Sequence, residues 1–156
     1  MSGNPGSNAA LAGGLLAAGG VATLATLQPD GGPFASYVVT APAADHAPLT
    51  LISRLARHTQ NLARDPRASL LIVGAPEPGG ESLTAPRLSL TGRCVTHDDE
   101  DARRRFLERH REAELYAGFA DFALYRFEIE SGHLVAGFGR IVDLTREQLL
   151  EAKADD

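Results

Sequence analysis

Seven short apolar runs, each bounded by turn-forming residues, limit what this chain can fold into more than any other feature of its sequence. Runs rich in Val, Ile, Leu and Thr favour β-strands, and Gly, Pro, Asn and Asp favour the turns between them. The predicted strands cover residues 21–28, 33–40, 48–53, 68–73, 87–97, 122–130 and 133–144. Only short helical segments separate these runs. We therefore expect a mainly β fold with inserted helices, in which six to seven strands form a closed antiparallel barrel rather than a doubly wound sheet.

Glycine-containing stretches predict where these strands turn or bend. The sequence "PDGG" at 29–32 predicts a tight turn that makes the first two strands a hairpin. Gly92 predicts a bend or bulge within the fifth strand, and Ser131 and Gly132 are expected to join the last two strands. The sequence "GFG" at 137–139 lacks the third glycine of a dinucleotide-binding turn, and we place it within the last strand.

Helix signals are weaker but distinct. Thr59 and Thr145 are predicted N-caps, and Ala102 and Phe106 are the predicted buried residues of a helix between them. Helices are expected near residues 9–18, 59–65, 98–110 and 145–153. These elements predict three parts: a flexible N-terminus with a short helix (1–20), one barrel domain (21–145) and a C-terminal helix (146–156).

Composition and charge exclude several classes of protein. A formal net charge of -5 argues against general nucleic-acid binding. No segment reaches the roughly 20 apolar residues of a membrane span, and the start lacks the positive n-region of a secretion signal. The single cysteine, Cys94, lies in a strand pattern and excludes an intrachain disulfide, while the histidines show no metal-ligand spacing. We expect a cytoplasmic protein without a metal site.

Positive charge gathers in "LISRLARHTQNLARDPRASLLIV" at 51–73, although the chain is acidic. No Lys or Arg precedes Arg54. A predicted strand ends at Ser53 and a helix follows, so the free N–H groups of the helix start lie beside Arg57, His58 and the Thr59 hydroxyl. These groups are the ingredients of a phosphate site. The alternative, a solvated Arg57 and a Thr59 that only caps the helix, is equally open from the residues alone.

Four stretches resemble the FMN-binding split-barrel superfamily that includes pyridoxamine 5′-phosphate oxidase, and its haem-utilisation branch in particular. They are "ATLATLQPDGGPFASYVV", "LISRLARHTQNLARDPRASLLIV", "RLSLTGR" and "AELYAGFADFALYRFEIESGHLVAGFGR". The resemblance implies a split barrel that forms a homodimer, with FMN in a groove between the subunits. It also implies an oxidoreductase that acts on a small-molecule substrate. A haem-binding or haem-degrading protein and a non-catalytic binding module on the same fold are the alternatives.

The resemblance assigns cofactor binding to nine residues, whereas catalytic residues stay unknown. The nine are Ser36, Tyr37, Val38, Ser53, Arg57, His58, Thr59, Asn61 and Arg87. Arg57 and His58 match the basic pair that holds the phosphate, with His58 in a position where many relatives have lysine. In "GHLVAGFGR", His133 and Arg140 are candidates for haem or substrate contact. Their alternative roles are a turn histidine and a salt-bridged strand arginine.

Overall fold

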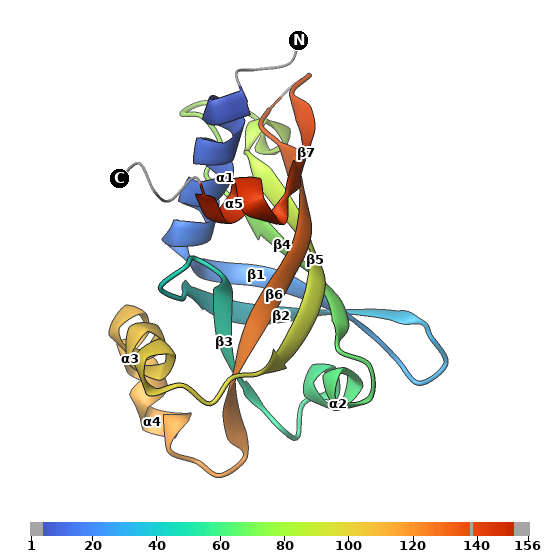
Figure 1. Ribbon diagram of the computed structural model, residues 1–156, viewed down its shortest axis with the longest axis vertical. Coiled ribbons are helices and arrows are strands. Elements are labelled where there is room, and N and C mark those ends of the chain that lie inside the picture. Colours follow the sequence, from blue (N-terminus) through green and yellow to red (C-terminus); the bar gives the residue numbers. More distant parts are fainter. Residues whose placement is uncertain (1–4, 138, 152–156) are drawn as a thin grey trace.

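A computed structural model describes residues 5–137 and 139–151 and shows one mainly β unit with a few helices (Figure 1). The strands are β1 (Gly20–Leu27), β2 (Pro33–Pro42), β3 (Pro48–Ser53), β4 (Arg67–Val73), β5 (Arg87–Thr96), β6 (Phe122–Val135) and β7 (Ile141–Thr145). The helices are α1 (Pro5–Ala18), α2 (Arg57–Arg64), α3 (Glu100–Arg109), α4 (Glu114–Ala117) and α5 (Arg146–Glu151), with the short 3-10 turns η1 (Ser82–Thr84) and η2 (Arg111–Ala113).

All described strands pair antiparallel in one sheet, in the order β3-β2-β1-β4-β5-β6-β7. β3 also pairs with β6, from Leu49↔Arg126 to Ser53↔Phe122, so β1 to β6 close into a barrel. The last residues of β6 pair with β7, which extends the sheet beyond the barrel (Figure 1). The predicted antiparallel barrel of six to seven strands is therefore confirmed.

Alternating burial separates an inner and an outer face of the sheet. On β5, Leu88 and Leu90 are fully buried, while Ser89 and Thr91 between and after them face outward. Cys94, in the same strand, continues the inner set and is 2% exposed. Full burial of a leucine side chain contributes roughly 1.5–3 kcal/mol, so these positions hold the barrel together.

The N-terminal helix is part of the packed core. α1 begins at Pro5, earlier than the expected helix, and its residues Ala12 and Leu16 are 0% and 2% exposed. α1 packs on α5, whose Leu149 is fully buried (Figure 1). Residues 1–4 and 152–156 of the expected terminal parts lie outside the described residues. No described helix is long and apolar enough to cross a membrane.

The predicted turn between the last two strands is wrong. β6 runs straight through Ser131 and Gly132, and the chain reverses at 136–140 instead. A Cβ on Gly132 would lie 2.9 Å from the Leu149 side chain, so this glycine makes room for α5. Gly137 and Gly139 have φ of 129° and 74°, a region that favours glycine, and they form the turn. Both glycines of the "GFG" sequence thus belong to the turn and not to a strand. The residue between them, Phe138, lies outside the described residues.

The other local signals give one further correction and three confirmations. Thr59 is not an N-cap: α2 begins two residues earlier, and its N-cap is Ala56, which offers no side-chain acceptor. The 29–32 hairpin turn is confirmed. Gly92 marks the expected bulge, because a Cβ there would lie 2.0 Å from the Glu128 carbonyl oxygen. Thr145 caps α5, with its Oγ1 accepting a hydrogen bond from the Gln148 amide.

Candidate functional site

Helix α2 is fixed to the end of the β1–β2 hairpin by buried polar contacts. The Asn61 side chain is 2% exposed, and its Nδ2 donates to Thr26 Oγ1 at 3.0 Å. Arg64 donates to Asn61 Oδ1 at 2.9 Å and to the Leu27 carbonyl at 3.4 Å. Asn61 therefore positions the helix, and both ends of its amide are already used within the protein.

The first turn of α2 carries polar atoms that the protein itself does not satisfy. Thr59 is 3% exposed, and its Oγ1 has no hydrogen-bond partner among the described residues. The Nε2 atom of His58 is buried without a partner in the same way, and burial lowers the pKa of this imidazole. A buried unsatisfied polar group costs about 1–3 kcal/mol. Such groups, next to the unbonded N–H groups of an uncapped helix start, fit a ligand that accepts hydrogen bonds and carries negative charge.

Arg57 and Ser53 stand beside this turn. Arg57 is exposed, and its guanidinium lies 5.6 Å from the centre of the Phe34 ring, a cation–π distance that holds it against β2. Ser53 Oγ donates to Asp121 Oδ2 at 3.3 Å and accepts a hydrogen bond from the Leu55 amide at 3.1 Å. The structure therefore brings Ser53, Arg57, His58 and Thr59 together in one strand-to-helix connection.

The three predicted residues of β2 do not share a face. Ser36 donates to the Leu24 carbonyl at 3.3 Å, and Val38 is 5% exposed in the core. Tyr37 points to the opposite, outer face and is 74% exposed. Tyr37 is therefore the predicted β2 residue on the outer face, whereas Ser36 is half-buried and Val38 is buried on the other face.

Arg87 lies far from α2 within one chain. It pairs with Val73 at the last residue of β4, whereas α2 joins β4 near Arg67 at its start. Six strand residues separate these ends, which corresponds to ~20 Å. The Nη1 atom of Arg87 donates to the carbonyls of Leu83 at 3.0 Å and Ala85 at 3.2 Å. A single copy therefore does not combine Arg87 with the first turn of α2.

The outer face of the sheet is open and partly apolar. One cross-strand row crosses it from β2 to β7 and contains Tyr37, Thr23, Leu71, Ser89, His133 and Asp143. Large apolar side chains flank this row: Val21, Val73 and Ile141 are 52%, 53% and 65% exposed. We call this surface, defined by the row and its three neighbours, the outer face. Exposed apolar surface of this kind marks a binding or interaction site.

His133 and Asp143 form an ordered pair on the outer face. The Nδ1–H group of His133 donates to Asp143 Oδ1 at 2.7 Å across β6 and β7. A carboxylate at Nδ1 fixes the tautomer and leaves the Nε2 lone pair available, which is the arrangement of histidines that ligate metals. Nε2 has no partner in the part of the chain that the structure describes. The described residues contain no cluster of three His, Cys, Asp or Glu suited to a bare metal ion.

Arg140 has a different place from the one expected. It lies in the turn between β6 and β7, and its Nη2 donates to Asn8 Oδ1 on α1 at 2.9 Å. It is therefore neither in a strand nor in a salt bridge with any described residue. Sequence reasoning also missed Asp143, because a turn placed at 131–132 put His133 and Asp143 in the same strand. Gly137 and Gly139, the two glycines of the observed turn, are the sequence feature from which this pairing could have been predicted.

Comparison with known proteins agrees with this geometry. The family model described as pyridoxamine 5′-phosphate oxidase matches residues 14–136. The chloroplastic heme oxygenase HOZ of Arabidopsis thaliana is 32% identical over 133 residues, which is 81% of this chain and 40% of that protein. A solved heme-binding protein from Mycobacterium smegmatis is 30% identical with a TM-score of 0.84, covering 97% of this chain and 62% of that one.

A third relative shares the fold at lower identity. ChuZ from Campylobacter jejuni superposes with a TM-score of 0.81 at 17% identity, over 95% of this chain and 63% of its own. The chain thus spans about two fifths of the plant protein and less than two thirds of these two solved chains. It belongs to the pyridoxamine 5′-phosphate oxidase family of split barrels, and its similarity is to the haem-utilisation branch of that family.

Proposed function

We propose that the protein binds haem, in a site formed by two copies of the chain. The observation that carries the proposal is the His133–Asp143 pair. It offers an imidazole nitrogen without a partner on the outer face, beside exposed apolar side chains. A carboxylate bonded to the second ring nitrogen fixes the tautomer of a histidine ligand and orients its ring. His133 would therefore hold the haem iron through Nε2.

The relatives support the same ligand. The plant relative is described as a heme oxygenase, and the mycobacterial protein as a heme-binding protein. The proposal draws on these two relatives, which are 32% and 30% identical to this chain.

The positions of the proposed ligand-binding groups support a site formed by two copies. The first turn of α2 lies at one end of the sheet. Arg87 and His133 both lie toward the other end. In an interface whose two-fold axis runs across the strands, a residue at one end of the surface contacts the other end of the partner's surface. Two outer faces packed in this way bring α2 of one copy toward Arg87 and His133 of its partner. The same packing covers the exposed apolar side chains of both copies.

The groups present fit haem in this arrangement. A haem has an apolar macrocycle, an iron that takes an imidazole nitrogen, and carboxylate tails. The outer face supplies apolar contact, and His133 Nε2 supplies the nitrogen. Arg57, the unsatisfied Thr59 hydroxyl and the helix N–H groups match the carboxylates, which accept hydrogen bonds.

Haem titration followed by absorbance tests the proposal. The wild type should give a saturable Soret band with the signature of histidine ligation. His133→Ala should abolish that signature, and Asp143→Asn should weaken binding by about 10- to 100-fold, the usual effect of losing a residue that orients a ligand. His97→Ala is the matched control, because His97 makes no side-chain hydrogen bond that involves a described residue. Spectra and affinity that are the same in wild type and His133→Ala would rule out His133 as the ligand.

FMN is the second candidate, and a separate observation favours it. The unsatisfied Thr59 Oγ1 and His58 Nε2 atoms at an uncapped helix start match the acceptor oxygens of a phosphate. If FMN binds there, Arg57→Ala should weaken binding by about 1.5–3 kcal/mol, or roughly 10- to 150-fold, through loss of a charge-assisted hydrogen bond. Quenching of flavin fluorescence measures this, with Arg146→Ala as the control on an exposed arginine of α5. If the protein takes up no FMN, or if Arg57→Ala binds FMN with unchanged affinity, then the phosphate of FMN does not bind at this turn.

A further inference from the structure

The first turn of α2 contains a histidine with one ring nitrogen that the protein leaves unpaired. The His58 imidazole is half-buried, and its Nε2 atom is buried without a hydrogen-bond partner among the described residues. The next residue, Thr59, has a buried and unpaired Oγ1 atom. Cα–Cβ bonds in a helix tilt toward its N-terminus, so both side chains are directed toward the start of α2.

The backbone of this turn offers hydrogen-bond donors in the same place. The first bond into the helix runs from the Gln60 amide to the Ala56 carbonyl at 3.1 Å, so the three amides before Gln60 have no acceptor within the helix. Ala56 gives them no side-chain cap, and Arg57 adds an exposed positive charge. An anion at the helix start therefore meets donors, with the His58 imidazole beside them.

Burial, and not a neighbouring charge, sets the protonation state of His58. Burial lowers the pKa of the imidazole, because it disfavours the charged form. α2 packs on β1 and β2. β1 contains no titratable residue, and Tyr37, the titratable residue of β2, lies on the outer face. These two strands therefore bring no charge to His58.

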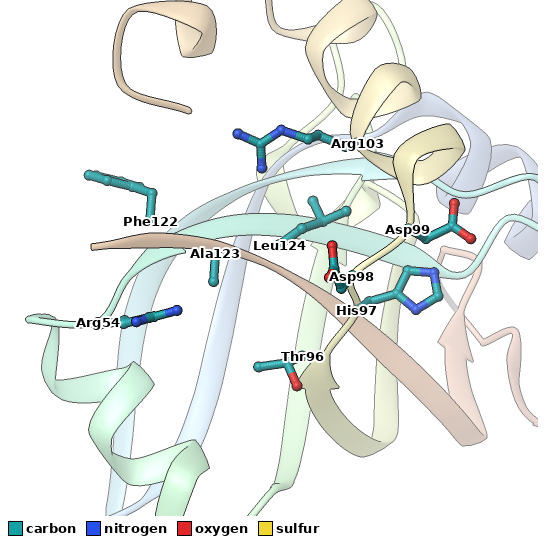
Figure 2. Close-up of a pocket in the computed structure, with 9 residues that line it drawn as sticks. All are labelled: Arg54, Thr96, His97, Asp98, Asp99, Arg103, Phe122, Ala123 and Leu124. Carbon is teal, nitrogen blue, oxygen red and sulfur yellow. The ribbon is translucent and has the colours of Figure 1, made fainter. Parts of the chain in front are cut away.

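The charged residues on the segments around the helix start are engaged elsewhere. Arg54, on the strand-to-helix connection, extends along β6 into the cleft between β6 and α3 (Figure 2). Asp121, on the loop before β6, accepts a hydrogen bond from Ser53 Oγ at 3.3 Å. Arg64, farther along α2, is bonded to Asn61. No described carboxylate is bonded to His58, so the imidazole is mainly neutral at pH 7 in the ligand-free protein.

The two forms of an imidazole treat an anion differently. The neutral ring has one donor and one acceptor nitrogen, whereas the imidazolium has two donors and a positive charge. An oxyanion at the helix start therefore favours the imidazolium, through a charge-assisted hydrogen bond. Because linkage is reciprocal, the proton strengthens anion binding by the same factor by which the anion strengthens proton binding.

We propose that an anionic group bound at the first turn of α2 takes up a proton on His58, so that the site holds carboxylates or phosphates more weakly as pH rises. This deepens the proposed function and rests on it, because the anionic group is a tail of haem or of FMN. Arg57 and the helix amides supply the part of the binding that does not depend on pH.

Sulfate binding at several pH values tests the proposal, because sulfate itself does not titrate near neutral pH. Amide-resolved NMR at constant ionic strength should show saturable shifts of Arg57, His58 and Thr59. The sulfate affinity should fall by about tenfold or more from about pH 6 to about pH 8, since linkage to one proton allows up to about tenfold per pH unit. Saturating sulfate should raise the pH midpoint of the His58 ring signals by about one unit or more.

His58→Gln keeps a hydrogen-bond donor but cannot titrate. Its sulfate affinity should change by about twofold or less over the same range. His58→Lys has a fixed charge, and at about pH 8 it should bind sulfate as tightly as wild type does at about pH 6. His97→Gln is the matched control, because His97 lines the cleft between β6 and α3 and not the start of α2. It should keep the pH dependence of wild type.

Haem and FMN titrations at both pH values identify the source of the anion. Comparison of wild type with His58→Gln cancels the titration of the ligand, so the excess pH dependence belongs to the ligand whose tail occupies the turn. Missing sulfate shifts, the same pH dependence in wild type and His58→Gln, or an unmoved His58 midpoint would each overturn the proposal. Proton-linked sulfate binding in a protein that takes up neither haem nor FMN would instead overturn only the proposed function.

Discussion

Two buried threonines near α2 should respond in opposite directions to the same substitution. Thr59 and Thr26 are 3% and 2% exposed, so burial is matched. Thr59 Oγ1 has no partner, whereas Thr26 Oγ1 accepts a hydrogen bond from Asn61 Nδ2 at 3.0 Å. Valine has nearly the shape of threonine without the hydroxyl. The two Thr→Val variants therefore isolate the effect of satisfying a buried hydroxyl.

The magnitudes follow from the cost of an unsatisfied polar group, about 1–3 kcal/mol. Thr59→Val removes such a group, and we expect the free energy of unfolding of the ligand-free protein to rise by about 1 kcal/mol. The melting temperature should rise by about 2–4 °C for a chain of this size. Thr26→Val leaves the Asn61 donor buried without its acceptor, and should lower the free energy of unfolding by about 1–2 kcal/mol.

Equilibrium unfolding in urea measures both variants. If Thr59 exists to bind an anion, Thr59→Val should also bind inorganic phosphate more weakly than wild type, so stability and binding change in opposite directions. The reasoning would be refuted if Thr59→Val were less stable than wild type, or if it bound phosphate with the same affinity as wild type. Equal effects of the two substitutions would show that the Thr59 hydroxyl is satisfied.

Three other predictions concern the scaffold. The Arg126 guanidinium lowers the pKa of Asp45 to about 2, so this pair stabilises the protein fully above the normal carboxylate pKa, and the stabilisation is lost as pH falls through about 2. Because the Asp45 side chain is 45% exposed, Asp45→Asn should lower the free energy of unfolding in urea by only about 1 kcal/mol near neutral pH, and by progressively less as pH falls toward 2. Burial raises the pKa of the Cys94 thiol to about 12, so a thiol reagent should modify Cys94 only in denaturant; rapid labelling of the folded protein would contradict its burial. Gly92→Ala should destabilise the protein by more than ~3 kcal/mol or prevent folding, because its Cβ would lie 2.0 Å from a carbonyl oxygen. Gly14→Ala, whose Cβ would meet nothing within 4 Å in α1, should instead stabilise the protein by about 0.5–1 kcal/mol. Equal melting temperatures for the two variants would contradict the bulge geometry.

The barrel was predictable because its strands are marked twice, by apolar runs and by the turns between them. Gly92 shows how specific such a signal can be, since a single glycine within a strand pattern marks the bulge. The turn at 136–140 was missed because two glycine-containing sites competed, and Gly132 serves packing against Leu149 instead. Tertiary contact with α5, which lies at the far end of the chain, decided between these sites, and no local pattern contains that information.

The candidate sites were predictable only in part. The basic residues around Arg57 mark the strand-to-helix connection, because their charge stands out in an acidic chain. The unsatisfied hydroxyl of Thr59 could not be predicted, since the sequence favoured an N-cap role that Ala56 takes instead. The partner of His133 depends on strand register, and the bond from Arg140 to Asn8 joins residues from opposite ends of the chain. These contacts follow from the closed barrel and not from spacing along the sequence.

Mixing two defective variants tests most directly whether two copies share one haem site. His133→Ala lacks the proposed ligand, and Arg57→Ala lacks the proposed contact to the carboxylate tails. If the site combines His133 of one copy with Arg57 of the other, an equal mixture of the unfolded and refolded variants should regain histidine-ligated haem. Half of the dimers are then mixed and each has one intact site, so about a quarter of the wild-type Soret signal should return. A mixture that binds no more haem than the two variants measured separately would contradict the shared site.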